Sequence, residues 1–307
     1  MDSTKEHTNE QRILSFCYGY GGLEKGISSI IPTRTIAYVE IEAFQNFNLV
    51  SAMESGVVDK APIWTNLKTF DPKPFHNKVH GIVGGYPCQG ESLAGKRELW
   101  NDDRFLYPHI EQCIDAINPF WCFFENVAGH LSGTFPYVLA SLQNLGYSVE
   151  AGLFTAEEVG APHQRKRVFI LAMDNTYIDE LQAQRERRLG LDGNLLQNCR
   201  RKEDTIRFRE TSKKLANSSS KRNGESSKEY ATRKFIKVSN QWPAYPGQQQ
   251  YEWEAKRAVE PGVDCTVNGY DFRTELLRQY GNGVVSQTAS KAFSMLLDKH
   301  INNSKLQ

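Results

Sequence analysis

Long apolar runs and paired cysteines are missing from this 307-residue sequence. No stretch approaches the roughly 20 apolar residues that a membrane-spanning helix requires, and residues 1–11 are too polar for a signal peptide. The six cysteines include no Cys-x-x-Cys pair and no His/Cys cluster at metal-ligand spacing, which argues against a disulfide scaffold and a zinc site. We therefore expect a cytoplasmic protein with reduced thiols, no metal and no membrane association.

An excess of charge of either sign is also missing, because 37 Lys and Arg residues are balanced by 36 Asp and Glu residues. The total neither favours nor excludes a nucleic-acid partner, so the distribution of charge matters more. Residues 175–240 are polar and rich in Arg, Lys, Ser and Asn. Such a stretch cannot bury a core of its own, and we expect an irregular small domain or a segment that orders on binding.

The sequence does contain alternating strand-like and helical patterns over residues 13–171, which are typical of a parallel α/β sheet. Because a short connection joins the last two predicted strands, we expect one of them to run antiparallel at the sheet edge. After Gly281 an apolar stripe predicts a closing helix that docks on the first domain. The predicted strands are 12–17, 35–39, 63–64, 78–83, 121–124, 147–154 and 168–173, the predicted helices are 42–55, 104–117 and 136–145, and the stripe is Val285, Ala289, Ala292, Phe293 and Leu296.

One cysteine lies in a turn-forming segment. Residues 79–83 have a strand pattern, and the following Gly-Gly-Tyr-Pro-Cys-Gln-Gly-Glu-Ser places Cys88 just beyond the strand end. A strand end is rigid and a loop leaves the sulfur accessible, so a nucleophilic thiol is one interpretation. A buried cysteine in a turn is the ordinary alternative.

The first predicted strand leads into a glycine-rich turn, residues 17–26. Glycines there let the backbone approach a ligand closely, and a helix N-terminus favours a carboxylate or phosphate. Glu40 ends the second predicted strand, where it is placed to accept hydrogen bonds from ribose hydroxyls. The turn and the acid together indicate a site for a nucleoside cofactor, while a surface acid remains the alternative for Glu40 alone.

The fifth predicted strand ends in Glu125-Asn126-Val127. The apolar residues before Glu125 predict partial burial, which raises the pKa of a carboxyl and lets it donate a proton. The alternative is a helix N-terminus with Asn126 as its cap. Arg165 and Arg167 lie two residues apart where a strand begins, so we expect both side chains on one face, with a solvated charge run as the alternative.

These motifs occur in a recognisable order: Gly19-Tyr20-Gly21-Gly22, Pro87-Cys88-Gln89, Glu125-Asn126-Val127, Arg165-Lys166-Arg167 and Gly281-Asn282-Gly283-Val284. In that order the chain resembles the DNA cytosine-5 methyltransferases of bacteria and phages over nearly its whole length. The resemblance implies an α/β fold with a Rossmann-like S-adenosylmethionine-dependent methyltransferase sheet and a small irregular target-recognition domain. We expect the catalytic domain at 1–175, the recognition region at 176–265 and a returning segment at 266–307.

The resemblance also implies a reaction. Cys88 would add to C6 of a cytosine flipped out of double-stranded DNA, Glu125 would act at N3, and Arg165, with Arg167 nearby, would reach the base near O2. The cofactor would be S-adenosylmethionine, released as S-adenosylhomocysteine. Its implied contacts are Phe16, Gly19, Tyr20, Gly21, Gly22, Glu40, Asn66, Pro87, Asn282 and Val284, and the implied contacts of the DNA loop are Gln89, Ser92, Lys96 and Arg97.

The sequence departs from the family pattern at Ser15, Cys17, Asn66, Glu91 and His163, with Phe16 as the substitute for the usual aromatic at Cys17. These departures bear on cofactor affinity and loop closure, whereas the three catalytic residues are retained. A cytosine-5 methyltransferase acting on tRNA, a non-catalytic DNA-binding relative and an unrelated cysteine hydrolase are the alternatives. We expect a monomer from a prokaryotic or phage-infected cell, with a restriction endonuclease as a possible partner.

Overall fold

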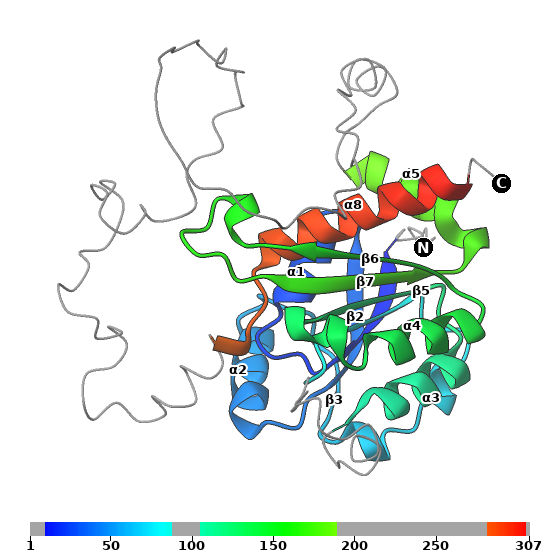
Figure 1. Cartoon of the computed structure of the whole chain (residues 1–307). Coiled ribbons are helices and arrows are strands. Elements are labelled where there is room, and N and C mark those ends of the chain that lie inside the picture. The colour runs from blue at the N-terminus through cyan, green and yellow to red at the C-terminus, as the bar shows by residue number, and fades with distance from the viewer. Residues whose placement is uncertain (1–9, 88–104, 189–280, 305–307) are drawn as a thin grey trace, which may run out of the picture.

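The computed structural model describes residues 10–87, 105–188 and 281–304. At its centre is one seven-stranded sheet in the order β3-β2-β1-β4-β5-β7-β6 (Figure 1). The predicted α/β sheet is confirmed, and the strand boundaries lie within about three residues of those expected. The strands are β1 (Gln11–Phe16), β2 (Thr33–Val39), β3 (Ile63–Trp64), β4 (Gly81–Gly84), β5 (Trp121–Val127), β6 (Ser148–Phe154) and β7 (Arg167–Met173).

Strand direction differs from the expectation in one respect. Strands β1 to β5 pair in parallel, and β7 is antiparallel to both β5 and β6. The antiparallel strand was expected at the sheet edge, and that position is wrong, because β7 inserts between β5 and β6 and leaves β6 as the edge strand. The chain reverses direction after β6, and β7 pairs with β5 on one side and with β6 on the other.

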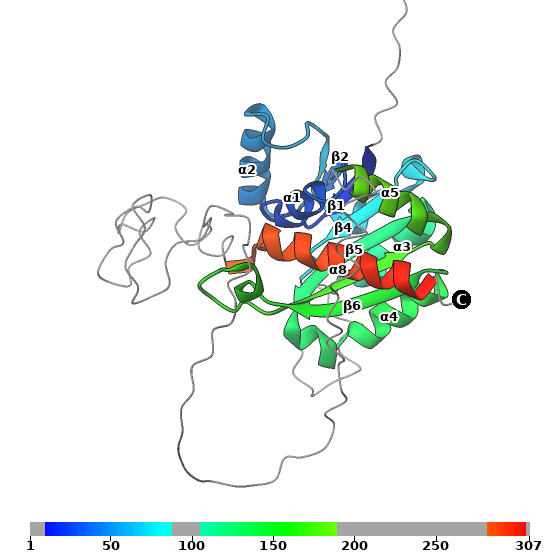
Figure 2. The ribbon, with the colours of Figure 1, turned by 90° about the horizontal axis from the view of Figure 1, so that it is seen from above.

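Helices cover both faces of the sheet (Figure 2). One face packs against α3 (Tyr107–Ile117) and α4 (Phe135–Asn144), and the other against α1 (Gly22–Ser28) and α8 (Ser286–Ser304). Successive strand residues point to opposite faces, so Phe124 belongs to the first core and Phe123 to the second. Both faces are therefore buried, as a mainly parallel sheet requires.

The predicted closing helix is confirmed as α8. Ala289, Ala292, Phe293 and Leu296 are buried, and the ring centroid of Phe293 lies 5.2 Å from that of Phe123. Sequence reasoning missed a helix beside it, α5 (Ile178–Arg188), because the exposed side of α5 is strongly polar. Its Ile178 and Leu181 nevertheless pack in the core of α8, so the sheet domain continues beyond residue 175. Most of the predicted recognition region lies outside the described residues.

The remaining elements lie at the ends of the sheet. One is α2 (Ala43–Glu54), whose Leu49 and Met53 pack on Tyr38. The others are the short turns η1 (Leu67–Thr69), η2 (Lys73–Phe75), η4 (Ala128–Ser132), η5 (Glu157–Val159) and η6 (Asn175–Tyr177). No helix within the three described ranges is long and apolar enough to cross a membrane. The carboxyl ends of β1, β2, β4 and β5 meet at one edge, and the candidate site lies there.

Candidate active site

A cavity of about 320 Å³ opens at this edge of the sheet. Segments far apart in the sequence meet around it: the glycine turn after β1, the residues after β2 and β4, the end of β5, the start of β7 and the turn before α8. Its lining includes most of the predicted site residues that the structure describes, namely Gly19, Tyr20, Gly22, Glu40, Pro87, Glu125, Arg167, Asn282 and Val284.

The glycine turn is tied to the end of β2 through Glu40. Gly19 and Gly21 have positive φ angles of 61° and 82°, a region that glycine adopts readily. The backbone N–H of Gly19 donates to Glu40 Oε2 at 3.0 Å, and the N–H of Glu42 donates to Oε1 at 2.9 Å. Each carboxylate oxygen keeps acceptor capacity beside the cavity, which fits the hydroxyls of a ribose. Burial raises the pKa of Glu40, although these two N–H groups oppose that effect.

The turn before α8 packs directly on the glycine turn. The hydroxyl of Tyr20 donates to the carbonyl of Val284 at 2.6 Å. A Cβ on Gly283 would overlap the ring of Tyr20, and a Cβ on Gly22 would overlap the carbonyl of Val284. Close approach therefore explains one glycine in each motif, Gly22 and Gly283. The two motifs are 264 positions apart at the Tyr20–Val284 hydrogen bond.

Glu125 lines the side of the cavity away from the glycine turn and is buried, with 7% of its surface exposed. Its Oε1 lies 2.9 Å from Arg167 Nε. Burial raises the pKa of Glu125 to about 7, even though the charges of Arg167 and Arg165 lower it. The expected elevation is thus confirmed, and near neutral pH this carboxyl can both hold and release a proton.

The end of β4 approaches the same carboxyl. A Cβ built on Gly85 would lie 3.3 Å from Glu125 Oε2, so the backbone that leads to Pro87 passes beside the acid. The interpretation of Asn126 as a helix cap is wrong, because Val127 occupies that position at η4. Asn126 instead donates from Nδ2 to the carbonyl of Tyr86 at 3.2 Å.

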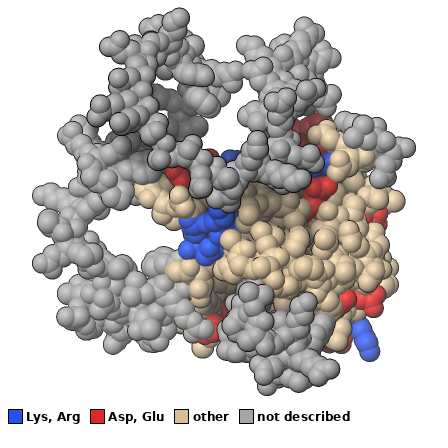
Figure 3. Space-filling view, viewed as in Figure 1, with Lys and Arg blue, Asp and Glu red and all other residues tan. Residues whose placement is uncertain are grey.

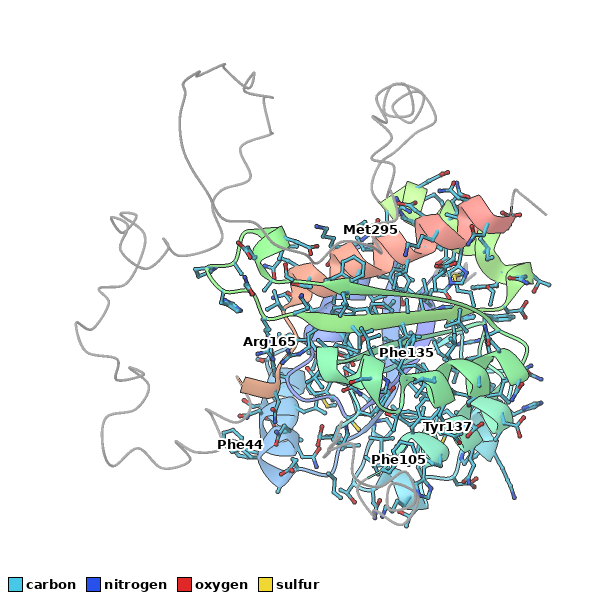
Figure 4. All side chains as sticks on the ribbon, in the orientation of Figure 1. Phe44, Phe105, Phe135, Tyr137, Arg165 and Met295 are labelled. Atoms are coloured by element: carbon cyan, nitrogen blue, oxygen red, sulfur yellow. The ribbon has the colours of Figure 1, made fainter. Side chains whose placement is uncertain are left out.

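Arg165 and Arg167 do not share a strand face as expected. Arg165 precedes β7 with a φ of 36°, so the alternation of an extended strand does not apply to it. Its guanidinium donates to the carbonyls of Gly281, at 2.8 Å, and of Gly283. Arg167 lines the cavity beside Glu125. Arg165 instead binds the turn before α8, next to which it lies in Figure 4. A compact group of basic side chains is visible near the start of β7 (Figure 3).

Three predicted cofactor contacts, Phe16, Gly21 and Asn66, do not line the cavity. Phe16 is fully buried, with its ring centroid 5.7 Å from that of Phe70, and Cys17 lines the cavity in its place. Burial raises the pKa of the Cys17 thiol to about 12, so it is neutral. Asn66 caps η1 by accepting from the N–H of Lys68 at 3.0 Å and does not line the cavity.

The departure at Ser15 has a partner on α1. The Ser15 hydroxyl donates a hydrogen bond to Glu24 Oε1. The carboxyl next to this part of β1 is therefore supplied by Glu24 of α1. Burial raises the pKa of Glu24 to about 7. Glu24 Oε2 has no hydrogen-bond partner, and no described Lys or Arg forms an ion pair with this carboxyl.

Cys88, Gln89, Ser92, Lys96 and Arg97 lie outside the described residues, as does Glu91. The preceding Pro87 lines the cavity. Sequence reasoning missed Tyr86, Gln45 and Leu106 as lining residues. Tyr86 was available as the neighbour of Pro87, whereas Gln45 and Leu106 lie in helical patterns whose approach to the cavity depends on the fold.

The sequence of the chain matches the model of one protein family. A family model described as C-5 cytosine-specific DNA methylase matches residues 11–296. The type II methyltransferase M.BspRI of Lysinibacillus sphaericus is 26% identical over 57% of the chain and 47% of its own length. The type II methyltransferase M1.ScrFI of Lactococcus lactis subsp. cremoris is 33% identical over 44% of the chain and 39% of its own length. The chain thus spans less than half the length of these two relatives. A crystal structure of a Spodoptera frugiperda DNMT2 mutant aligns with a TM-score of 0.45 and 23% identity, over 54% of this chain and 50% of that one.

Proposed function

The chain belongs to the C-5 cytosine-specific DNA methylase family, and on that premise we propose that it transfers a methyl group from S-adenosylmethionine to C5 of cytosine in double-stranded DNA. The observation that carries the proposal is Glu125, a carboxyl with a pKa of about 7. It lies in a cavity that is also lined by Pro87, the residue before Cys88. Such a carboxyl supplies the proton that activation of cytosine requires.

The chemistry follows from the weakness of C5 as a nucleophile. Addition of the Cys88 thiolate to C6 forms a C6–S bond and moves electron density to N3 and C5. The carboxyl of Glu125 donates a proton to N3, which prevents charge from building up there. After methylation, loss of the C5 proton to a base restores the C5–C6 double bond, breaks the C6–S bond and regenerates the thiolate. The N3 proton returns to the Glu125 carboxylate, which leaves a neutral 5-methylcytosine and the acid in its starting form.

We assign the two arginines different roles. Arg167 lines the cavity and holds Glu125 at 2.9 Å, so it is placed to donate to the base beside the acid. Arg165 binds the carbonyls of Gly281 and Gly283 and positions the turn before α8. The resemblance implies that Arg165 contacts the base near O2. In this proposal Arg167 makes that contact instead.

The residues on the other side of the cavity fit S-adenosylmethionine. Glu40 offers carboxylate acceptors for the ribose, and Gly19 to Gly22 let the backbone come close to the ligand. When bound, this cofactor supplies an electrophilic methyl group on a sulfonium and departs as S-adenosylhomocysteine. Glu40 suits its positive charge, and no arginine or lysine among the described residues lines the cavity on this side.

Double-stranded DNA is the proposed substrate, and the target cytosine must leave the stack at a cost of a few kcal/mol. Residues 176–265 are the proposed recognition region, where Arg and Lys would neutralise phosphates and other side chains would read base edges. The type II names of the relatives support a place beside a restriction endonuclease. That partner and a cytoplasmic location remain part of this proposal.

The full chain with labelled S-adenosylmethionine and genomic DNA tests the proposal. We expect 5-methylcytosine in the hydrolysed DNA, at sites that bisulfite sequencing identifies, and no product with Cys88→Ala. Transfer to tRNA in place of DNA would replace the proposed substrate. A wild-type chain that binds the cofactor but methylates neither nucleic acid would contradict the proposal.

A further inference from the structure

We propose that Tyr86 and His130 form a positioning pair that fixes the turn before Cys88 and thereby sets the reactivity of its thiol. This inference rests on the proposed function, because it assigns a role to residues directly behind the same site. The pair joins two segments that are 44 positions apart, the turn after β4 and the η4 turn after β5.

Tyr86 is held by its backbone, its ring and its hydroxyl. Asn126 Nδ2 donates to its carbonyl at 3.2 Å, and its hydroxyl lies 3.1 Å from His130 Nε2. Its ring packs against Phe124 and Tyr107, with centroids 5.9 and 5.5 Å away. Only 4% of Tyr86 is exposed, although it contributes to the lining of the cavity. These contacts restrict the backbone two residues before Cys88.

His130 is fully buried and satisfied on both sides of its ring. Its Nδ1 lies 3.0 Å from Thr134 Oγ1, and its ring meets those of Tyr86 and Phe135 edge to face. Because both polar partners are hydroxyls, which donate or accept, a neutral imidazole is satisfied in either tautomer. Phe135 begins α4, on the sheet face that α3 and α4 cover (Figure 4).

The position of His130 determines which two segments the pair connects. It follows Glu125 by one short turn, in the segment that continues β5 into η4. The Tyr86–His130 contact and the Asn126–Tyr86 hydrogen bond therefore join the described segment that precedes Cys88 in the sequence to the strand that carries the acid. A misplacement of about 1 Å between reacting groups can cost on the order of 100-fold in rate. The two hydrogen bonds lie among apolar side chains, where hydrogen bonds are stronger than in water, and they restrict such movement.

Ordinary core packing is the competing explanation, and substitutions separate the two. Tyr86→Phe removes only the hydroxyl, His130→Leu removes both polar ring atoms, and His130→Gln keeps hydrogen-bonding capacity. Tyr107→Phe is the matched control, because it also removes a buried hydroxyl from a ring in contact with Tyr86. The hydroxyl of Tyr107 bonds Val138 and Ser141, both at 3.4 Å, and does not reach His130.

Two readouts in the full-length chain test the proposal. The first is the alkylation rate of Cys88 by iodoacetamide, resolved from other cysteines by peptide mass spectrometry. The second is the rate of covalent complex formation with duplex DNA containing 5-fluorocytosine and S-adenosylmethionine. Thermal unfolding and the KM for S-adenosylmethionine are measured in parallel, since a positioning role changes kcat more than KM.

We expect Tyr86→Phe and His130→Leu each to slow complex formation by about 10-fold to 100-fold and to change the alkylation rate, with little change in KM. The double variant should be no slower than the slower single variant, because both remove the same contact. His130→Gln should recover part of the rate, and Tyr107→Phe should match the wild type.

Folded Tyr86→Phe and His130→Leu proteins with wild-type rates in both readouts would overturn the positioning pair. So would rates that follow the loss of thermal stability equally in Tyr107→Phe. If the wild type forms no complex with DNA or tRNA while the variants still change Cys88 alkylation, the proposed function fails and the positioning pair stands.

Discussion

Buried carboxyls lie on both sides of the cavity, but their surroundings differ. The cofactor wall is formed by Gly19–Gly22 and Glu40, and Glu24 lies behind it. The two acids there accept hydrogen bonds from a hydroxyl and from backbone N–H groups. On the base wall, formed by Glu125 and Arg167, the acid is paired with a guanidinium. Burial raises the pKa of Glu24 and of Glu125 to about 7 in both settings.

From this difference we infer two distinct roles for carboxyls of similar pKa. Glu125 reaches the cavity, where a ligand can take its proton, and Arg167 fixes its orientation. Glu24 is not part of the lining, so its carboxyl fixes α1 against β1 and does not meet a ligand. We therefore expect substitutions on the base wall to affect turnover and those on the cofactor wall to affect binding or stability.

Replacement of Glu125 by Gln should have the largest effect. Gln keeps the size of the side chain but cannot donate a proton as an acid, so we expect kcat to fall by about 1,000-fold. Steady-state methylation of duplex DNA measures this loss. Glu24→Gln, the same change behind the cofactor wall, is the control and should retain at least a third of wild-type kcat. Equal losses in both variants would erase the difference between the walls.

The pH profile of kcat should show whether Glu125 is the acid of the base wall. Glu125 has a pKa of about 7, so the acid form becomes scarce above that pH and kcat should decline there. Glu125→Gln has no such group and should lose this alkaline decline. The pH dependence of kcat between about 6 and 9 checks the prediction, and an unchanged decline in the variant would assign it to another group.

Replacement of Arg167 by Lys should lower kcat by about 100-fold, because Lys cannot keep the planar donor geometry of a guanidinium beside Glu125. In Arg167→Ala the loss of a cation that lowers the pKa of Glu125 should also move the alkaline decline to higher pH. Arg165→Lys is the matched comparison and should affect kcat less, since Arg165 holds the carbonyls before α8. A larger effect at Arg165 would reverse the two assigned roles.

On the cofactor wall, Glu40→Gln should raise the KM for S-adenosylmethionine about tenfold and leave kcat within about threefold of wild type. The reason is the loss of a charged acceptor, which contributes roughly 1.5–3 kcal/mol to a hydrogen bond. Isothermal titration with S-adenosylhomocysteine measures the binding directly. Unchanged affinity would remove Glu40 from the cofactor site.

The smallest effect concerns stability. Glu24 has a folded pKa of about 7 and an ordinary value of 4.5, so the folded state retains its proton between these pH values. Stability from this group is therefore lost as pH rises from about 4.5 to 7. Glu24→Gln should reduce the loss between pH 5 and pH 8 by about 1–3 kcal/mol, as measured by urea unfolding. An identical pH dependence in both proteins would contradict the buried state of this carboxyl.

Periodicity predicted most of the fold, since apolar runs mark strands that are buried on both faces. It did not predict the insertion of β7 between β5 and β6, because strand order depends on pairing across the sheet. It also missed α5, in which a few apolar residues such as Leu181 suffice to dock a polar helix on α8.

The site was predictable only in part. The motifs identified Glu125 and Glu40, whose positions at strand ends follow from the parallel sheet. The different directions of Arg165 and Arg167 depend on one left-handed residue, which no strand pattern reveals. The contact of Tyr86 with His130 and the hydrogen bond of Ser15 with Glu24 join residues whose proximity arises from tertiary packing.

The most direct test of the account is intact-mass analysis of the full chain with duplex DNA containing 5-fluorocytosine and S-adenosylmethionine. Fluorine at C5 prevents the proton loss that would release the enzyme, so a covalent complex should accumulate and map to Cys88. Glu125→Gln should form it about 1,000-fold more slowly, whereas Glu24→Gln should form it at nearly the wild-type rate. A complex attached elsewhere, or equal rates in Glu125→Gln and the wild type, would contradict the account.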